Sequence, residues 1–457
     1  MEKKNLAGGE FVTFVNSQGI KVRGTLLKLS INQIIFEVYN PYSLVQMSEV
    51  LSDLTIVRVE KKIYQGKATV TNTVNTGIIL VVYATLYENF WKNNIDVSSR
   101  EEIEAEINYL FKNFDSEQNI DAEFKTSVIA VRSFLLGLRA WFEKLEPDFA
   151  TAKIDVNAEF LLQNFKLLFE KMYEMCCKLH HSGMSVDQDR FHHYMIFVQD
   201  LLHQFFMSSP FPHRAYSKPL GYAGDYEMMR MIQRENAEGP NLFTKFINVF
   251  YTNIPIANCV KNRTVQLVKL ITKKINEAES RGEEFRSLSI GCGPALEIKK
   301  FLNNNNPKIK CHFTLLDFNQ ETLDFAVNQS LQAAKGKSCE IYGEINSVHE
   351  LLKRSVSLQK EEEKYDLVYC SGLFDYLSDR ICSKLIKLFF TMIKLGGTVL
   401  VTNMHSNNKD NKIMEMLLEW NLIYRDEANM SSLVPGLGSQ KLFTDETGVN
   451  LCLEINK

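Results

Sequence analysis

Two glycines and a downstream acid have the spacing of a nucleoside-binding site. Gly291 and Gly293 flank Cys292 directly after an apolar run, and a second apolar run over 312–316 ends on Asp317. Glycines at a strand-to-helix turn let the backbone approach a ligand without a Cβ in the way. The carboxylate of Asp317 could accept hydrogen bonds from both ribose hydroxyls. The unit therefore predicts a site for an adenosine-containing ligand at the carboxyl edge of a parallel sheet.

The residues after the second glycine argue against a dinucleotide. A pyrophosphate site uses a third glycine to pack the next helix closely, and Pro294, Ala295 and Leu296 stand there instead. Gly-x-Gly-Pro with a downstream acid resembles the first motif of class I S-adenosylmethionine-dependent methyltransferases. The resemblance implies S-adenosyl-L-methionine as the cofactor. We expect this cofactor to contact Gly291, Cys292, Gly293, Asp317, Phe318, Asn346, Ser347, Ser371, Arg263 and Tyr222.

The composition describes a globular protein without a strong net charge. The chain has 457 residues, 45% of them apolar, and a formal net charge of -3. This length predicts two or three domains, and this charge gives no electrostatic reason to expect a nucleic-acid partner. No apolar run is long enough to predict a membrane span. The 9 cysteines form no Cys-x-x-Cys pair, which predicts neither a zinc site nor a dithiol centre and favours a reducing, cytoplasmic location.

Residues 10–88 have the pattern of a small β-barrel. Short apolar runs alternate with turns, and the last two runs form a hairpin around the Asn-Thr-Gly turn at 75–77. The segment KVRGTLLKLSINQIIFEVYNP resembles PilZ-type barrels, which often bind cyclic di-GMP. Ser30 of the nucleotide motif is present, but Lys28 and Gln33 replace its acid and its glycine, and no Arg-x-x-x-Arg arm precedes them. We therefore expect docking or dimerisation from this barrel rather than nucleotide binding.

Residues 91–209 are predicted to be helical. A capped helix start is expected at Ser98 or Ser99, and Pro147 and Gly183 are expected to separate the helices. Apolar residues recur at helical spacing over 126–145, 157–181 and 189–206. The region could serve as a spacer, a homodimer interface or a lid. Its histidines have no ligand-like spacing, so we expect no metal at His180, His181, His192, His193 and His203.

From residue 210 onward, apolar strands alternate with helical segments. Such alternation predicts an α/β domain, a parallel sheet with helices on both faces, and the terminal hairpin is typical of a Rossmann-like class I methyltransferase domain. Strands are expected at 287–291, 312–317, 339–342, 365–370 and 397–403, with the hairpin at 440–443 and 450–455.

Two loops at the carboxyl ends of these strands should form the walls of the active site. One loop, 371–377, follows the strand 365–370, and the other begins where the strand 397–403 ends. Polar side chains in both loops could orient a methyl acceptor or remove its proton. We expect catalytic roles for His405, Asn403, Tyr376 and Asp375.

The segment 212–226 combines tyrosines, cations and glycines in a stretch that is too broken to predict regular structure. Ordinary linkers are polar rather than aromatic, so we expect a clamp over the cofactor and the substrate. A helix after the strand 397–403 is expected to carry Trp420, Tyr424 and Arg425. The candidates for substrate binding are Tyr216, Arg214, Lys218, Asp225, Tyr226, Trp420 and Arg425.

Several longer segments resemble one methyltransferase family more closely. HRAYSKPLGYAGDYEMM, SGLFDYLSD, NMHSNN and MEMLLEWNLIYR are similar to segments of the 3-hydroxypalmitic acid methyl ester synthases, which make a bacterial cell-density (quorum) signal. Some of those enzymes carry a PilZ-like barrel at the N-terminus. The resemblance implies three parts: a PilZ-like barrel over 1–90, a helical linker or interaction domain over 91–209, and a methyltransferase domain over 210–457.

The family resemblance implies O-methylation of a small molecule with a fatty-acid-like carboxylate. A carboxylate is ionised at pH 7 and needs no base. An alternative is N-methylation of a small amine or amino acid, with His405 or Asp375 as the base. A non-enzyme alternative is a cyclic-di-GMP-type signalling receptor whose methyltransferase half only binds its ligand.

Overall fold

The computed structural model describes residues 11–29, 32–39, 45–58, 61–75, 79–87, 104, 107, 120–353 and 364–457. The chain divides into two compact units whose segments interleave. The first unit, which we call the barrel-helix unit, comprises Met1–Ala223, Glu235–Ile254 and Lys409–Asn421. The second, the sheet unit, comprises Gly224–Arg234, Pro255–Asn408 and Leu422–Lys457. The predicted division into three domains stays a prediction.

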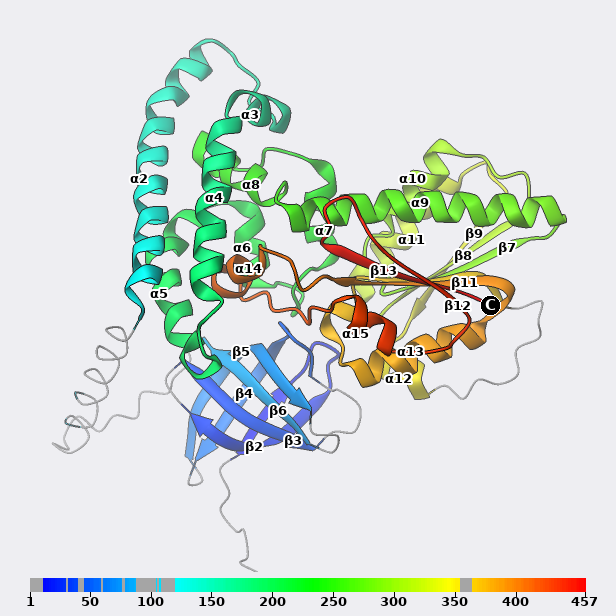
Figure 1. The fold of residues 1–457 in the computed structure, drawn as a ribbon, viewed down its shortest axis with the longest axis horizontal. Helices are drawn as coiled ribbons and strands as arrows, with labels where there is room; N and C mark the ends of the chain where they lie inside the picture. Colours follow the sequence, from blue (N-terminus) through cyan, green and yellow to red (C-terminus); the bar gives the residue numbers. More distant parts are fainter. Residues whose placement is uncertain are drawn as a thin grey trace, which may run out of the picture. The chain divides into compact units, whose positions relative to one another are not determined.

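The barrel-helix unit begins with a closed barrel in the order β1-β2-β3-β6-β5-β4 (Figure 1). Alternate residues point inward along each strand, and Val12, Phe14 and Phe36 lie fully inside. Its strands are β1 (Phe11–Val15), β2 (Lys21–Leu29), β3 (Gln33–Tyr39), β4 (Val50–Arg58), β5 (Lys61–Asn75) and β6 (Ile79–Leu86). The predicted six-stranded barrel is thus confirmed. Ser30 and most of the predicted hairpin turn, Thr76 and Gly77, lie outside the described residues.

The same unit contains a set of helices that differs from the expected set in two places. The helix α2 continues to Thr151 through Pro147, because this proline is exposed in the last turn, where the carbonyl it leaves free can meet water. The first part of the segment 212–226, expected to be irregular, lies in the helix α6 (Pro210–Ser217), which starts with a proline in its first turn, whereas 218–225 form neither helix nor strand. The predicted start at Ser98 or Ser99 lies outside the described residues. The other helices are α2 (Ala122–Thr151), α3 (Ala158–Asn164), α4 (Lys166–Gly183), α5 (Gln188–Phe206) and α8 (Leu242–Tyr251).

The helix α14 (Asn411–Leu418) also belongs to the barrel-helix unit, although the chain on either side of it belongs to the sheet unit. The amide of Gln199 donates to the carbonyl of Met416 at 2.9 Å, and the hydroxyl of Ser48 donates to the carbonyl of Asn421 at 2.9 Å. The expected helix through Trp420 and Arg425 is wrong, because Glu419 adopts a left-handed conformation (φ 47°) that ends α14.

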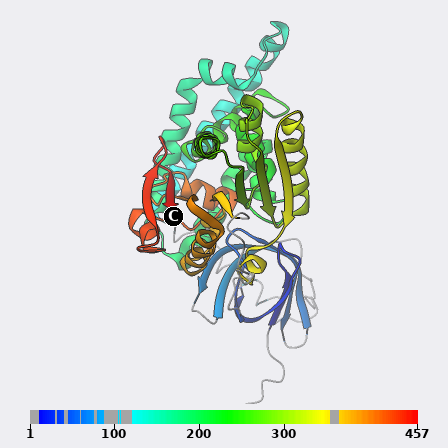
Figure 2. The same cartoon turned by 90° about the vertical axis from the view of Figure 1, so that its right-hand side faces the viewer.

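The sheet unit is built on a seven-stranded sheet in the order β12-β13-β11-β10-β7-β8-β9 (Figure 2). The strands β9, β8, β7, β10 and β11 run parallel, and only β13 and β12 form antiparallel pairs. The predicted Rossmann-like sheet with its terminal hairpin is therefore confirmed. Its strands are β7 (Phe285–Ile290), β8 (Cys311–Asp317), β9 (Cys339–Ile345), β10 (Tyr365–Ser371), β11 (Ile393–Met404), β12 (Ser439–Thr444) and β13 (Asn450–Asn456).

Helices cover both faces of this sheet, as Figure 1 shows for α9 and α13. Along β10, Val368 and Cys370 pack in the core between the sheet and α13. Leu367 and Tyr369 pack in the core between the opposite face of the sheet and the helices α9 and α10. Its helices are α7 (Tyr226–Arg234), α9 (Pro255–Arg281), α10 (Leu296–Asn304), α11 (Gln320–Ala334), α12 (Val348–Lys353), α13 (Asp379–Met392) and α15 (Glu427–Ser432). In the part of the chain that the structure describes, no helix is long and apolar enough to cross a membrane.

Candidate active site

The glycine turn between β7 and α10 forms the floor of the candidate site. Gly291 and Gly293 have positive φ angles of 61° and 51°, which L-residues rarely adopt. Ala295 also adopts a left-handed conformation, with φ 47°, at the N-cap of α10. A strained backbone of this kind is typical of functional turns. Because the strand order reverses between β7 and β10, this turn lies where ligands bind in open α/β sheets.

Asp317 ends β8 beside this turn, with 5% of its surface exposed. One carboxylate oxygen accepts from the amide of Gly293 at 3.1 Å, and the other accepts from the amide of Asn319 at 3.1 Å. Burial raises the pKa of Asp317 to about 6, although the backbone donors oppose this shift. The group is therefore mostly ionised at pH 7, and each oxygen keeps a lone pair for a further donor.

Arg263, on α9, is a buried cation with an unpaired donor atom. Only 9% of its surface is exposed, and its Nη1 atom makes no hydrogen bond. The guanidinium lies against Gly372, where an added Cβ would come within 3.1 Å of Nη1 and of Nη2. A buried guanidinium with unpaired N–H groups is unfavourable, so this arrangement favours a ligand that brings a carboxylate.

Two more buried polar atoms at this edge have no hydrogen-bond partner. They are the hydroxyl of Ser371, which ends β10, and the side-chain oxygen of Asn346, which follows β9. The amide of Asn346 donates to the carbonyl of Asp317 at 3.0 Å, which places Asn346 beside the ribose candidate. Native proteins rarely leave buried polar atoms unpaired. Together with Arg263, these atoms indicate a polar ligand.

The loop after β10 carries a second buried acid, Asp375. Its Oδ1 atom accepts from the amide of Met404 at 2.6 Å, and 3% of the residue is exposed. Burial raises the pKa of Asp375 to about 6, while the nearby guanidinium groups of Arg263 and Arg425 oppose this shift. Among the described residues, no side chain or amide donates to its second oxygen.

Arg425, predicted to bind substrate, instead holds the loop after β10 in place. Its guanidinium donates twice to Asp379, at 2.9 and 2.7 Å. The other bonds run to the carbonyls of Phe374 and Leu377 and to the side-chain oxygen of Asn403. All five N–H donors of the group are therefore used within the protein, which corrects the expectation of a direct contact with substrate.

Asn403 and His405, predicted to be catalytic, are also engaged. The amide nitrogen of Asn403 donates to the carbonyls of Met404 and Ile423, each at 2.9 Å. His405 accepts from the amide of Asn407 on Nδ1 at 3.0 Å, so its proton lies on Nε2, 3.1 Å from Glu427. Both residues fix the end of β11, and His405 has no ring nitrogen left to act as a base.

The predicted substrate residues Arg214, Tyr216, Lys218 and Trp420 and the predicted cofactor residue Tyr222 belong to the barrel-helix unit. Lys218 is 3% exposed, and its ammonium donates to the carbonyls of Leu418 at 3.0 Å and Tyr216 at 3.3 Å. The ring of Tyr216 packs edge-on against His203. These contacts give both residues structural roles within that unit.

Four further candidates lie in the sheet unit. Asp225 caps α7 by accepting from the amide of Met228 at 2.9 Å. The hydroxyl of Tyr226 donates to Glu321 at 2.8 Å. Ser347 bonds Glu350 through its amide at 3.0 Å and through its hydroxyl at 3.2 Å, at the start of α12. These bonds shape local structure, whereas the half-buried Tyr376 forms part of the short 3-10 helix after β10.

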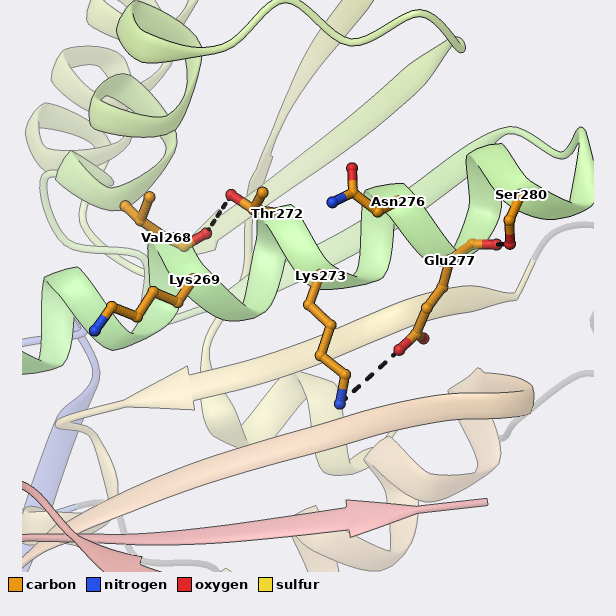
Figure 3. A pocket seen from close by; sticks show the side chains of 7 residues that line it. All are labelled: Val268, Lys269, Thr272, Lys273, Asn276, Glu277 and Ser280. Atoms are coloured by element: carbon orange, nitrogen blue, oxygen red, sulfur yellow. Dashed lines mark hydrogen bonds and ion pairs between the residues drawn. The ribbon is translucent and has the colours of Figure 1, made fainter.

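A surface hollow of about 610 Å³ on α9 is separate from this constellation (Figure 3). One face of the helix supplies the whole lining, and it includes none of the predicted site residues: Val268, Lys269, Thr272, Lys273, Asn276, Glu277 and Ser280. Within the described ranges, no group of three or more His, Cys, Asp or Glu side chains could hold a metal ion.

Sequence reasoning missed two residues of the site. Gly372, with φ +98°, provides the surface against which Arg263 lies. Glu297, in the first turn of α10, is 7% exposed and accepts from the hydroxyl of Tyr369 at 2.8 Å. The position of Gly372 directly after β10 could have indicated its contact with Arg263. No pattern in the sequence pairs Glu297 with Tyr369.

Comparison with known proteins gives structural likeness only. No family model matches the chain, and no curated protein matches it. A possible exported protein of Bordetella parapertussis is 16% identical with a TM-score of 0.42, covering 54% of this chain and 86% of its own. Magnesium protoporphyrin IX methyltransferase (ChlM) of Synechocystis, solved with bound SAH, is 9% identical with a TM-score of 0.33, covering 45% of this chain and 88% of its own. The N-methyltransferase NodS of Bradyrhizobium japonicum, also solved with SAH, is 14% identical with a TM-score of 0.30, covering 43% of this chain and 85% of its own.

Proposed function

We propose that this protein is an S-adenosylmethionine-dependent methyltransferase acting on a small molecule. The observation that carries the proposal is the set of unpaired polar groups around the glycine turn: the guanidinium of Arg263, the hydroxyl of Ser371 and the side-chain oxygen of Asn346. They stand beside the buried, mostly ionised Asp317. The set suits a ligand with a sugar, a carboxylate and a nitrogenous base.

The residues present fit S-adenosylmethionine group by group. Asp317 would accept from the ribose hydroxyls, because both of its oxygens keep a lone pair. Arg263 would bind the methionine carboxylate with two parallel hydrogen bonds. The cradle of Gly291 and Gly293 has no Cβ to exclude the ligand. Asn346, after β9, would face the adenine.

The cofactor, when bound, supplies a methyl group on a sulfonium, whose neutral thioether is the leaving group. The chain's own task is to bind and align, since contact at about 3 Å in the right direction provides much of the rate. The carboxylate of Asp317 and the hydroxyl of Ser371 are buried, which limits the access of water to these two groups. Arg425 and Asn403 hold the two wall loops at fixed positions.

Two acceptor chemistries remain within this proposal. The family resemblance supports O-methylation of a fatty-acid-like carboxylate, as in the synthesis of a 3-hydroxy fatty acid methyl ester. The alternative is methylation of an amine. Both use the same cofactor site, so the proposed function does not depend on the choice between them.

Calorimetric titration with S-adenosylhomocysteine tests the proposal. We expect one site per chain with micromolar affinity. The variant Arg263→Gln should bind at least tenfold more weakly, because its amide cannot make a charged, two-point contact with the carboxylate. The variant Arg286→Gln, at the exposed start of β7, is the matched control and should bind like the wild type. The absence of binding in the wild type would refute the proposal.

A further inference from the structure

We propose that the methyl acceptor carries a proton on its nucleophilic atom, as an amine or a hydroxyl does, and that Asp375 receives this proton. The inference rests on the proposed methyltransferase function and selects the acceptor class for the same site. Two features of this edge support it. One is the oxygen of Asp375 that could take up a proton, and the other is the lack, in the described ranges, of a cation that could hold an acceptor carboxylate.

Among the described residues at this edge, Asp375 is the proton acceptor with a spare atom. His405 uses both ring nitrogens, accepting from Asn407 and facing Glu427. Asp317 accepts a backbone amide on each oxygen and is assigned to the ribose. Glu297 accepts from the hydroxyl of Tyr369, whose ring packs in the core between the sheet and the helices α9 and α10. Asp375 is anchored through Oδ1 to the amide of Met404, which leaves Oδ2 for a substrate.

The charges at this edge argue against an acceptor carboxylate. Such a group needs a cation to orient it, and the guanidinium of Arg425 has no donor left. Arg263 has unpaired donors, but the methionine carboxylate of the cofactor would take them. A second carboxylate would then face the ionised Asp375 with no guanidinium donor left to bind it, and like charges in a buried site disfavour each other.

The proposed step balances within the site. The lone pair of the acceptor forms the new bond to the methyl carbon, and the carbon–sulfur bond breaks with its electron pair going to sulfur. The proton of the acceptor passes to Oδ2 of Asp375, which later releases it to water. No oxidant, reductant or metal is needed.

The surroundings of Asp375 suit a base that works near neutral pH. Burial raises its pKa to about 6, and Arg263 and Arg425 limit this rise. The thiols that face it, Cys370 on β10 and Cys382 on α13, have pKa values raised by burial and stay neutral at pH 7. Asp375 is therefore mostly ionised at pH 7, and the rate should fall as the pH drops through 6.

The chemical stability of the product tests the acceptor class. The protein is incubated with methyl-labelled S-adenosylmethionine and the small-molecule fraction of a cell extract, and the labelled product is then treated with mild base. Methyl esters release volatile methanol, whereas methyl ethers and methylamines keep the label. We expect the label to stay in solution. Release of the label as methanol would overturn the inference, while calorimetric binding of S-adenosylhomocysteine would still support the proposed function.

The variant Asp375→Asn tests the residue. The asparagine oxygen can still accept from the amide of Met404, so the loop should keep its fold. We expect turnover to fall by about 10²- to 10⁴-fold, with the acid limb of the pH profile lost and the affinity for S-adenosylhomocysteine within about threefold of the wild type. Full turnover with an unchanged pH profile would refute the role of Asp375.

Asp366→Asn is the matched control for the buried carboxylate. Asp366 lies at the opposite end of β10, where it accepts from the amide of Arg286 at 2.8 Å and pairs with Lys394 at 2.9 Å. This variant should lower the melting temperature but leave the pH profile of turnover as in the wild type. A loss of the acid limb in this variant as well would assign the limb to unfolding and overturn the inference.

Discussion

Asp317 and Arg263 provide the two charged contacts on which the proposed cofactor site depends most. Asp317 is an acid whose pKa is raised by burial, and Arg263 is a buried cation whose Nη1 atom makes no hydrogen bond. Each is unfavourable in the free protein and becomes favourable when a complementary group arrives. This combination is typical of a binding site rather than of a structural ion pair.

The raised pKa of Asp317 predicts how ligand affinity depends on pH. The ionised carboxylate accepts the ribose hydroxyls, and its pKa near 6 lies above the ordinary value of 3.8, so the ionised fraction falls as the pH drops through 6. We expect the affinity for S-adenosylhomocysteine to fall roughly tenfold between pH 7 and pH 5. Calorimetry at both pH values measures this change. In Asp317→Asn the affinity should be weak and independent of pH, and a wild-type slope in this variant would contradict the ribose assignment.

Gly372 can be tested through the guanidinium that it supports. Gly372→Ala should destabilise the fold by about 1–2 kcal/mol because of its left-handed backbone, and it should also displace Arg263, since the new Cβ would lie 3.1 Å from both Nη atoms. We expect at least tenfold weaker binding of S-adenosylhomocysteine. Gly396→Ala is the control, because Gly396 has φ +79° but no neighbour within 4 Å of a new Cβ. Equal affinities in the two variants would show that Arg263 does not bind the ligand.

At the scale of the elements, Arg425 joins the two loops that form the walls of the candidate site, one after β10 and one at the end of β11. This side chain connects the carbonyls of Phe374 and Leu377, after β10, with Asn403 at the end of β11. Loops that carry functional groups need such support from the scaffold, because a shift of about 1 Å can cost two orders of magnitude in rate.

Replacement of Arg425 should therefore affect stability before it affects binding. Arg425→Met leaves two buried carbonyls and the oxygen of Asn403 without donors, and we expect a loss of about 3 kcal/mol in the free energy of unfolding. Urea denaturation measures the loss. Arg286→Met, at an exposed ion pair, should cost less than about 1 kcal/mol. A fully stable Arg425→Met with weak substrate binding would restore the sequence-based role of Arg425.

The elements were predictable where local patterns determine them. The strands β7, β8 and β10 are buried and apolar, and the glycine turn and Asp317 have fixed offsets from them, so both the sheet and the position of this turn beside Asp317 were predictable from the sequence. The end of α14 was not predictable, because Glu419 adopts a left-handed conformation that depends on tertiary contacts. The side-chain amide of Gln199 donates to the carboxylate of Glu419, and the hydroxyl of Ser48 donates to its backbone carbonyl. Both partners come from distant parts of the chain.

At the scale of the whole molecule, the segment Lys409–Asn421 belongs to the barrel-helix unit, although the chain before and after it belongs to the sheet unit. It leaves the sheet unit after Asn408 and re-enters at Leu422, and it packs with the barrel and the helices in between. Lys218 and Glu419, both buried and both in a left-handed conformation, influence each other electrostatically in this packing.

This arrangement predicts a structural role for Lys218. Lys218→Met should leave the buried Glu419 without its cation and lower the free energy of unfolding of the barrel-helix unit by about 3 kcal/mol. The double variant Lys218→Met/Glu419→Gln should recover much of this loss, because the uncompensated charge is gone. Urea denaturation followed by tryptophan fluorescence measures both. If Lys218→Met kept its stability and lost affinity for S-adenosylhomocysteine or for the acceptor, the sequence-based prediction of a binding role would stand.

The candidate site was only partly predictable for the same physical reason. Arg263, Ser371 and Asn346 were expected near the cofactor, and the structure leaves each with an unpaired buried atom. Arg425 and His405 looked equally reactive in the sequence. Their hydrogen bonds to residues far away in the chain occupy their functional atoms, and residue type alone does not reveal such pairing.

The most direct test of the account is a crystal structure of the protein soaked with S-adenosylhomocysteine. The account predicts density for the nucleoside over the turn of Gly291 and Gly293, with the ribose hydroxyls within hydrogen-bond distance of Asp317 and the carboxylate on Arg263. An empty edge at saturating ligand, or a ligand bound elsewhere in the sheet unit, would contradict it.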